Sequence, residues 1–498
     1  MTWHELLPLF LVLSSLIPGL AIFFLREQAR RSRILLNMGG AVLKTLLMGV
    51  MIVGIYQGQD FEFRIPFMLD YDLVLHGDAM SVMFATLSTI LWLVTTIYAI
   101  GYLENSPNRS RFFGFFSLCV SATIGIALAG NMITFVVFYE LLTLATYPLV
   151  VHRGTPEALR AGRIYLIYTL TSGTLLLVAV LWLRTLEGPL DFTAAGLLAD
   201  TDPQHHPALI IIFWMLIISL GVKAALVPLH GWLPMAMVAP APVSALLHAV
   251  AVVKAGAFGI IRVIYDVYGI EFAESLGVLT GLAVIAAITV IYGSVRALLQ
   301  DDLKKRLAYS TVSQVSYITL GVAIFGPLAT IGGVTHLVHQ GIMKITLFFC
   351  AGNLAETLHI HKVSEMAGVG RRMPWTMAAF TIGALGMIGL PPLAGFASKW
   401  FLGVGAAERE MAWVLWVLAG SSALNAAYFL PILYAAWFKS PERDWHEEFP
   451  QARFETHWML LWPPVVTALL VLLAGLFAVS AYSPLGWAKI IAAREYLQ

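Results

Sequence analysis

The sequence predicts an all-α polytopic membrane protein with about fourteen transmembrane helices, on three observations. First, 59% of the 498 residues are hydrophobic and only 12% are charged, whereas soluble domains carry about 25% charged residues. Second, apolar stretches of about 20 residues, the length that crosses a bilayer, recur along the chain. Third, basic residues gather in alternate loops. The near-neutral net charge of +1 excludes a nucleic-acid-binding protein, because no basic face is available for phosphate.

The apolar stretches follow one another without a linker or low-complexity tract that would mark a second domain. The first apolar stretch is followed by a basic loop and not by a signal-peptide cleavage site. We therefore interpret this stretch as a membrane span. The apolar patch Phe61 to Leu75 is expected along the outer interface, and the loop at 440–457 on a solvated surface. Cys119 and Cys350 are expected as small core residues. The predicted spans are 5–25, 34–56, 79–103, 112–130, 132–151, 164–186, 208–230, 241–261, 275–295, 307–326, 328–352, 375–400, 411–438 and 459–482.

The distribution of Lys and Arg predicts the orientation of these spans. Of the 30 basic residues, 19 fall in the odd-numbered loops, six in the even-numbered loops and termini, and five inside predicted spans. The positive-inside rule then places the odd-numbered loops in the cytoplasm and both termini outside.

Five lysines and the mid-span Glu140 lie inside the predicted spans, where a central lysine costs about 2.5–3.5 kcal/mol. Such groups either form structural ion pairs and extend to the interface, or serve as titratable stations on an ion path. We favour the ion path for all of them except Lys44, for which both interpretations stand and a contact with a partner subunit is possible. The six residues are Lys44, Glu140, Lys223, Lys254, Lys344 and Lys399.

Two of the spans are predicted to be broken helices. Pro228 lacks an N–H and crowds the preceding turn, so the span at 208–230 is expected to open one turn after Lys223. The Pro391-Pro392 pair interrupts the span at 375–400 just before Lys399. Broken helices at matching places in two halves are typical of inverted-repeat transporters.

Histidines add a polar stripe to the predicted ion path. His336, Gln340 and Lys344 recur every four residues on one helix face, with His339 beside them. His248 lies between Lys223 and Lys254 in sequence and is also expected to relay protons. No carboxylate or thiolate joins these histidines, so no metal site is predicted.

Two other classes of function are weighed against an ion path. An oxidoreductase needs cofactor ligands, and the spans contain no CxxC, GxGxxG or paired-histidine haem arrangement, so no cofactor is expected. The chain could still be a pumping subunit of a redox complex. A solute transporter needs a polar site at the midplane, whereas the midplane groups here form a line.

Four long motifs between residues 227 and 400 carry a resemblance to a known family, and the resemblance extends over about residues 76–440. The chain resembles the antiporter-like subunits of Mrp-type cation/proton antiporters, respiratory complex I and membrane-bound hydrogenases. The resemblance is strongest to the D-type subunits of Mrp antiporters, because the complex I subunit of similar length has a glutamate where Lys399 stands. The motifs are VPLHGWLPMAMVAPAPVSALLHAVAVVKAG, DLKKRLAYSTVSQVSY, HQGIMKITLFFCAG and GLPPLAGFASKW.

The resemblance implies two five-helix repeats related by inversion, at 112–262 and 263–440. Residues 1–111 then hold helices 1–3, and 441–498 hold a loop and helix 14. It implies that Glu140 pairs with Lys223, that His248, Lys254 and Lys344 continue the path, and that Lys399 ends it. Many members have a histidine where Gln340 stands, so this step is expected to use His336, His339 and water.

The function implied is an ion-translocating subunit of an Mrp-type antiporter in a bacterial or archaeal cell membrane. Its partners would be other membrane subunits, protons and Na+. The alternative is a proton-pumping subunit of a complex I-like oxidoreductase, a membrane-bound hydrogenase or an ion-gradient-driven uptake complex. In either case a Glu140 carboxylate beside Lys223 stabilises the ammonium, and separating the pair releases the proton.

Overall fold

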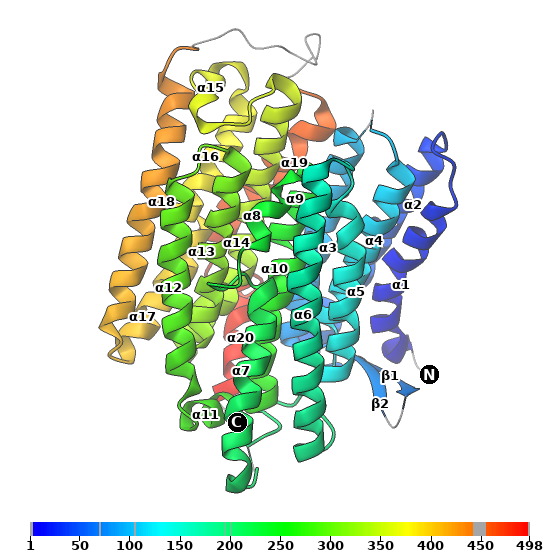
Figure 1. Cartoon of the computed structure of the whole chain (residues 1–498), viewed down its shortest axis with the longest axis vertical. Helices are drawn as coiled ribbons and strands as arrows, with labels where there is room; N and C mark the ends of the chain where they lie inside the picture. Colours follow the sequence, from blue (N-terminus) through cyan, green and yellow to red (C-terminus); the bar gives the residue numbers. More distant parts are fainter. Residues whose placement is uncertain are drawn as a thin grey trace.

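The chain folds into one bundle of long helices that run between two opposite ends (Figure 1). The computed structural model describes residues 3–68, 71–103, 106–194, 196–199, 201–441 and 455–496. Both termini lie at the same end of the bundle, here called the terminal end, and the other is called the opposite end. The long helices are α1 (Trp3–Phe23), α2 (Arg30–Tyr56), α3 (Ala79–Tyr102), α4 (Arg109–Ala127), α5 (Met132–Val150), α6 (Pro156–Glu187), α7 (His206–Lys223), α12 (Val278–Leu298), α13 (Leu303–Val322), α14 (Pro327–Leu358), α18 (Ala412–Phe438) and α19 (Trp458–Leu476).

Shorter helices complete the spans and the connections between them. They are η1 (Pro203–His205), α8 (Trp232–Met235), η2 (Ala236–Val238), α9 (Ala241–Ala249), α10 (Val252–Arg262), η3 (Val263–Tyr268), α11 (Ile270–Ser275), η4 (Val363–Glu365), α15 (Val369–Arg372), α16 (Pro374–Ile388), α17 (Ala394–Glu408) and α20 (Pro484–Tyr496).

These helices confirm the predicted class of an all-α polytopic membrane protein. Among the described residues, 11 helices are long and apolar enough to cross a membrane, and each matches a predicted span. The three remaining predicted spans correspond to α13, α14 and the pair α16–α17. The first two carry several polar residues, and the third is divided into two helices of 15 residues each. A count of fourteen is compatible with this structure.

Among the described residues, three of the predicted spans are broken, not two. The break before Lys399 lies between α16 and α17, as predicted. The break after α7 begins directly at Ala224, because Lys223 is the last helical residue, and not one turn later as predicted. The span at 241–261 was predicted as one helix and is instead divided into α9 and α10 at Val250 and Ala251. No proline or glycine marks this third break in the sequence.

The two predicted repeats contain matching features in the same order. The third helix of each segment, α6 in one and α14 in the other, has 32 residues. The fourth helix of each is broken, at α7–α8 and at α16–α17. These features agree with an inverted repeat, which stays a prediction.

The apolar patch that was expected along the outer interface forms a β-hairpin, and its position at the interface stays a prediction. Strands β1 (Glu62–Met68) and β2 (Tyr71–His76) pair antiparallel, from Glu62 opposite His76 to Met68 opposite Tyr71. The ladder is irregular between Pro66 and Met68. Val74 also bonds backbone-to-backbone with Gly130, which fixes the hairpin to the connection between α4 and α5.

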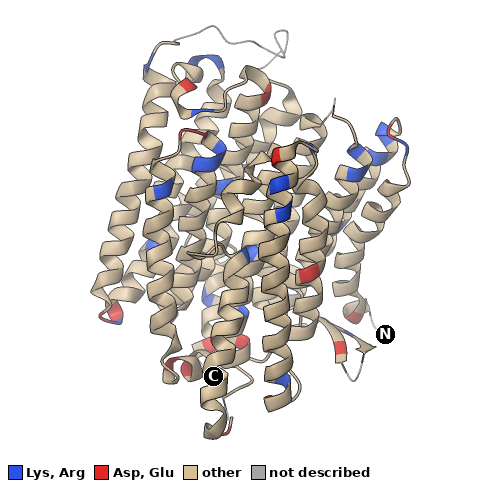
Figure 2. Cartoon of the chain, viewed as in Figure 1, with Lys and Arg blue, Asp and Glu red and all other residues tan. Residues whose placement is uncertain are grey.

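Charged residues lie mainly toward the two ends of the bundle (Figure 2). Lys and Arg are concentrated toward the end opposite the termini, in agreement with the predicted charge asymmetry. Much of the predicted solvated loop, 442–454, lies outside the described residues. Cys119 and Cys350 are both buried and free, as expected of small core residues.

Candidate functional site

The first candidate pair, Glu140 and Lys223, lies where α5 meets the end of α7. The Nζ atom of Lys223 is fully buried and donates a 2.5 Å hydrogen bond to the backbone oxygen of Tyr139. It also lies 3.3 Å from the centroid of the Tyr139 ring. Glu140 is the next residue along α5, and the two charges act on each other through space. Among the described ion pairs there is no direct contact between them, so the pair is close but separated.

The carboxylate of Glu140 faces α6 without a hydrogen bond to Oε1 within the described chain. It packs on Gly173, where an added Cβ would overlap the carboxylate. The absence of a side chain at Gly173 therefore gives Glu140 its place between α5 and α6.

The break after α7 is held by side chains from other elements. The carbonyl of Val222 loses its helical partner and accepts a 2.7 Å hydrogen bond from the indole of Trp232. The N–H of Val227 donates to Oγ1 of Thr289 on α12 at 3.1 Å. The freed backbone is thus satisfied inside the protein, as membrane depth requires.

Lys254 and His248 lie on either side of the unpredicted break between α9 and α10. Both side chains are fully buried. Within the described part of the chain, neither the Lys254 ammonium nor either ring nitrogen of His248 has a hydrogen-bond partner. Lys254 lies within electrostatic range of both His336 and Lys344 on α14.

The polar stripe on α14 is buried against α13 and α17. Nδ1 of His336 lies 2.8 Å from Oγ of Ser398, the residue before Lys399. The nitrogens of His339 and the amide of Gln340 have no partner among the described residues. The three residues of the predicted stripe therefore share a buried helix, and His336 connects it toward Lys399.

Lys399 closes the break between α16 and α17. Its Nζ donates to the backbone oxygens of Met387 and Ile388, at 2.9 Å and 3.0 Å, and to Oγ of Ser422 at 3.2 Å. These are the last carbonyls of α16, the negative end of its dipole, so the ammonium caps a helix C-terminus. The side chain packs across Gly389, where a Cβ would lie 2.9 Å from Cδ of Lys399.

A hydrogen-bonded bridge connects Lys344 to the position of Lys399. Lys344 donates to Oγ of Ser310 at 2.8 Å. The Tyr428 hydroxyl bonds the same oxygen at 2.9 Å and also bonds Oδ1 of Asn425. The amide of Asn425 donates at 3.3 Å to the Met387 carbonyl that Lys399 also caps.

Lys44 is distinct from this group. It is buried inside the chain and does not face outward, which corrects the interpretation as a contact with a partner subunit. Its Nζ donates to Oγ of Ser15 at 2.6 Å and lies 4.8 Å from the centroid of the Trp92 ring. These contacts with α1 and α3 satisfy the ammonium locally.

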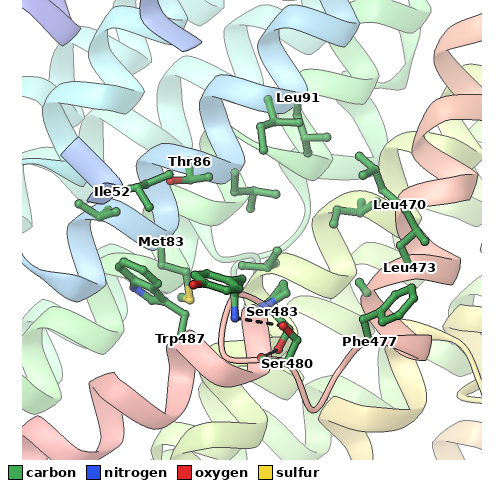
Figure 3. Close-up of a pocket in the computed structure, with 18 of the residues that line it drawn as sticks. Ile52, Met83, Thr86, Leu91, Leu470, Leu473, Phe477, Ser480, Ser483 and Trp487 are labelled. Carbon is green, nitrogen blue, oxygen red and sulfur yellow. Dashed lines mark hydrogen bonds between the residues drawn. The ribbon is translucent and has the colours of Figure 1, made fainter. Parts of the chain in front are cut away.

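The pocket drawn in Figure 3 has a volume of about 610 Å³, and Val338 and Ile342 of α14 form part of its wall. Side chains of α2, α3, α14, α19 and α20, together with the segment between α19 and α20, line it. Its lining contains apolar residues with a few hydroxyl groups, and no Lys, Arg, His, Asp or Glu. Such a lining suits hydrocarbon better than ions.

Several residues of the candidate site were not predicted. Ser310, Gln314 and Tyr317 repeat on one face of α13 and lie against the stripe of α14, a periodicity visible in the sequence. Tyr428 and Asn425 show a similar spacing on α18. His230, in the break after α7, has a buried Nδ1 without a partner among the described residues. No sequence signal separates it from a surface histidine.

Comparison with known proteins identifies the family. Residues 129–425 match the family described as NADH:quinone oxidoreductase/Mrp antiporter, TM, and residues 62–113 match complex I, chain 5 N-terminus. The chain belongs to this family of membrane subunits. It is 35% identical over 400 residues to the N subunit of NADH-quinone oxidoreductase from Desulforudis audaxviator MP104C, covering 77% of this chain and 78% of that one.

Three further similarities are to subunits of larger membrane assemblies. The chain is 28% identical to the D-type subunit of the Na(+)/H(+) antiporter from Bacillus subtilis 168, over 94% of each protein. It spans only 60% of the longer hydrogenase-4 component B of Escherichia coli K12, to which it is 31% identical over 80% of its own length. The fold matches a chain in the structure of the Mrp complex from Dietzia sp. DQ12-45-1b, with a TM-score of 0.84, 21% identity and coverage of 100% and 98%. This chain is therefore a multi-pass membrane subunit of the antiporter and complex I-like family.

Proposed function

We propose that this subunit conducts protons through the membrane within a multisubunit Mrp-type cation/proton antiporter. The observation that carries the proposal is a line of ionisable groups in the interior of a membrane bundle. The line extends from α5 through α7, α9, α10 and α14 to α17. We call it the polar line, and its residues are Glu140, Lys223, His248, Lys254, His336, His339, Lys344 and Lys399.

The separated pair at the start of the polar line supports a switching mechanism. Lys223 bonds the backbone of Tyr139, one residue from Glu140. Direct contact with Glu140 would stabilise the ammonium, and the separated state instead leaves it against a neutral carbonyl and a ring. Moving between the two states would make Lys223 take up and release a proton without any cofactor.

The remaining groups would carry the proton from Lys223 to Lys399. Lys254 has no hydrogen-bond partner in the described structure, and its charge acts on both His336 and Lys344 of α14. It is therefore suited to exchange a proton with either residue. His336 is placed to pass the proton on, because its ring bonds the residue next to Lys399. Lys399 ends the path beside a broken helix, where backbone groups line a polar break.

The similarity to the D-type subunit of a Na(+)/H(+) antiporter, over nearly the whole of both chains, supports the Mrp assignment. In such an assembly the partners are other membrane subunits, and the ions exchanged are protons and Na+. Both termini would lie outside a bacterial or archaeal cell membrane.

A redox-driven assembly is the second candidate. It is favoured by the 35% identity to an NADH-quinone oxidoreductase subunit. The same polar line would then pump protons as part of a complex I-like oxidoreductase, with redox centres in other subunits. The chain itself would remain a transport subunit in either assembly.

Three matched lysine variants test the proposal. The intact complex is isolated with its partner subunits, reconstituted in liposomes, and assayed for proton flux driven by a Na+ gradient or by NADH. We expect Lys344→Met and Lys399→Met to reduce flux on the order of tenfold or more, because a titratable relay group typically contributes that much. Lys44→Met makes the same chemical change at a locally satisfied lysine and should leave flux unchanged.

Equal flux in all three variants would show that these lysines are structural. The driving force separates the two candidates: flux under a Na+ gradient alone supports the antiporter, and flux only with NADH supports the redox-driven assembly.

A further inference from the structure

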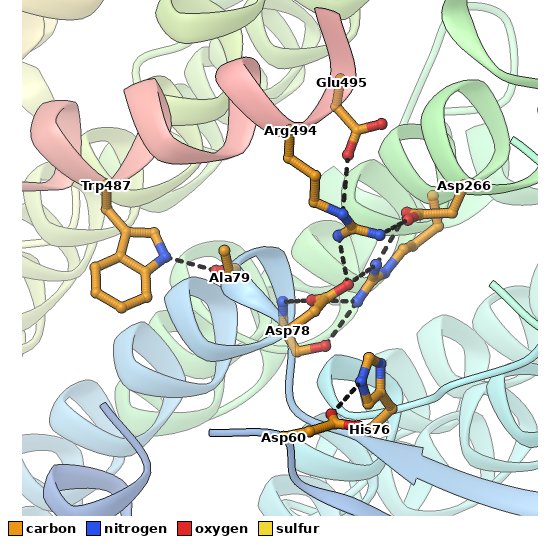
Figure 4. Close-up of polar contacts among 10 residues, drawn as sticks. Asp60, His76, Asp78, Ala79, Asp266, Trp487, Arg494 and Glu495 are labelled. Carbon is orange, nitrogen blue, oxygen red and sulfur yellow. Dashed lines mark hydrogen bonds and ion pairs between the residues drawn. The ribbon is translucent and has the colours of Figure 1, made fainter. Parts of the chain in front are cut away.

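A second group of buried charges lies toward the terminal end, where α10 and α20 meet the start of α3 (Figure 4). Arg262 at the end of α10 and Arg494 on α20 each bond both Asp78 and Asp266, at 2.7–2.9 Å. Asp78 also caps α3 by accepting a 2.7 Å hydrogen bond from the N–H of Ser81. Two carboxylates and two guanidiniums thus form a closed and electrically neutral square.

Glu495 is a third acid beside this square, and in the described part of the chain no third Lys or Arg pairs with it. Its residue is 5% exposed, and neither carboxyl oxygen has a hydrogen-bond partner among the described residues. The nearest charge, Nε of Arg494, lies 3.7 Å from Oε1, and Arg494 already bonds both aspartates. An ionised Glu495 would leave a buried negative charge without compensation, so this carboxyl group is suited to hold a proton.

Two members of the square are partly exposed to solvent, unlike the buried Glu495. The Arg494 side chain is 22% exposed, and that of Asp78 is 10% exposed. His76 lies beside Asp78 in Figure 4 and bonds the exposed Asp60 at 2.9 Å. Protons from the medium therefore have titratable groups near the cluster.

On the inner side, hydroxyl groups lead to α14. Tyr496, the residue after Glu495, has its hydroxyl 2.9 Å from Oγ1 of Thr330. Tyr265 bonds the same Thr330 oxygen at 2.6 Å and lies within the electrostatic reach of Glu495. His336 follows Thr330 by six residues on α14, a rise of about 9 Å along the helix. The titratable and charged groups that surround Glu495 are thus Asp78, Arg262, Tyr265, Asp266, Arg494 and Tyr496.

We propose that Glu495 is a proton-binding residue through which protons pass between the medium at the terminal end and the start of α14. The inference rests on the proposed proton conduction and adds an entry or exit group to the polar line. The carboxylate takes a proton from water on one side and returns it to water or a hydroxyl on the other. Only O–H bonds form and break, and no further reactant is needed.

Infrared titration of the purified complex tests the site without relying on transport. We expect a protonated-carboxyl band that disappears between about pH 5 and about pH 9, within the reach of a carboxyl group shifted by burial. The band should be missing in Glu495→Gln and shifted in Glu495→Asp. Glu274→Gln, which changes an exposed carboxyl on α11, is the matched control and should retain it.

Flux measurements on the same variants complete the test. Glu495→Gln should reduce proton flux several-fold, and Glu495→Asp should preserve part of it with a shifted pH profile. A band unchanged in Glu495→Gln, or normal flux in that variant, would overturn the inference and leave the cluster as an anchor for α20. Unchanged flux in Lys344→Met and Lys399→Met would instead overturn the proposed conduction, and the infrared band would still report on Glu495.

Discussion

The lysines of the polar line differ in what satisfies each ammonium. Lys223 and Lys399 each lie against a helix break and bond backbone carbonyls. Lys344 bonds a serine hydroxyl, and Lys254 has no partner in the described structure. A group with weak or exchangeable partners changes its protonation state at lower cost than one fixed in an ion pair. This difference favours Lys254 as the mobile member and Lys399 as the anchored end.

Glu140→Gln is predicted to abolish switching at the first pair while the complex remains assembled. The change removes the charge and keeps the shape, so flux should fall on the order of tenfold or more. Removing this charge also changes the electrostatic environment of the buried Lys223 ammonium, so complex yield and thermal stability are measured alongside flux. Glu157→Gln, at an exposed position on α6, is the control. Wild-type flux in assembled Glu140→Gln would contradict the role of this carboxylate.

Gly173→Ala is predicted to impair transport by steric displacement alone. The new methyl group would occupy the space of the Glu140 carboxylate, which must then move. Flux should fall several-fold without any change of charge. Gly49→Ala on α2 is the matched control, because its Cβ would meet no atom within 4 Å. Identical flux in both glycine variants would mean that the position of Glu140 is unimportant.

His336 is predicted to be the more sensitive histidine on α14. It bonds Ser398 next to Lys399, whereas His339 and Gln340 have no partner in the described residues. Proton flux in inverted vesicles should fall most in His336→Ala, less in His339→Ala, and change little in Gln340→His. If both alanine variants retain full flux, the histidines serve packing and the path crosses α14 through water and Lys344.

At the scale of elements, the sequence predicted whole helices better than their interruptions. Long apolar stretches predicted the 11 described helices that are long and apolar enough to cross a membrane, and the prolines near Lys223 and Lys399 indicated two of the breaks. The break between α9 and α10 has no such marker, because its residues are small or β-branched and the local geometry depends on tertiary packing. One neighbour is Gly341 of α14, where a Cβ would lie 2.9 Å from the Ala249 carbonyl.

The elements that the sequence did not predict were missed for the same reason. The β-hairpin and α20 are short, and each is fixed by contacts with distant residues and not by its own periodicity. The charge cluster was missed for the same reason, since Asp78, Arg262 and Arg494 are far apart in sequence and meet only in the fold. Individual ionisable residues inside spans were visible in the sequence, but their partners were not.

The docking of α20 is predicted to depend on pH. Burial, with a contribution from Asp266, raises the pKa of Glu495 to about 7. The folded protein therefore keeps a proton that the unfolded chain loses above about pH 4.3. The resulting stability is complete at low pH and is lost as pH rises through about 7. Thermal unfolding of the complex should shift to lower temperature from pH 6 to pH 8, about the interval around this pKa.

Two companion variants separate this effect from the rest of the cluster. Glu495→Gln should show a smaller pH dependence, because glutamine does not titrate. The control Glu274→Gln should retain the wild-type dependence. The guanidiniums of Arg262 and Arg494 outweigh the effect of burial and hold the pKa of Asp78 well below its usual range, so Asp78 does not titrate in this interval. An equal pH dependence in Glu495→Gln would assign the effect to another group.

At the scale of the whole molecule, the fold places polar, apolar and charged residues in three different regions. Polar residues needed for the candidate path are enclosed by the helices, apolar side chains cover much of the outside, and charges lie toward the two ends. The two ends differ in charge: 19 basic residues lie in the odd-numbered loops and six elsewhere outside the spans. By the positive-inside rule, this asymmetry predicts the orientation of the bundle in the membrane. An ion path that begins and ends on defined sides needs this fixed direction.

Cysteine labelling tests that direction, and this chain is suited to it. Its two natural cysteines, Cys119 and Cys350, are fully buried and should not react with a membrane-impermeant maleimide. New cysteines are placed at exposed positions on α11 and α15, which lie toward opposite ends of the bundle, as Glu274→Cys and Arg371→Cys. In intact cells the positive-inside rule predicts labelling at 274 and none at 371 until the membrane is permeabilised. The reverse pattern would place both termini inside and invert the direction of the polar line, and labelling at both positions in intact cells would contradict a bundle that spans the membrane between these two ends.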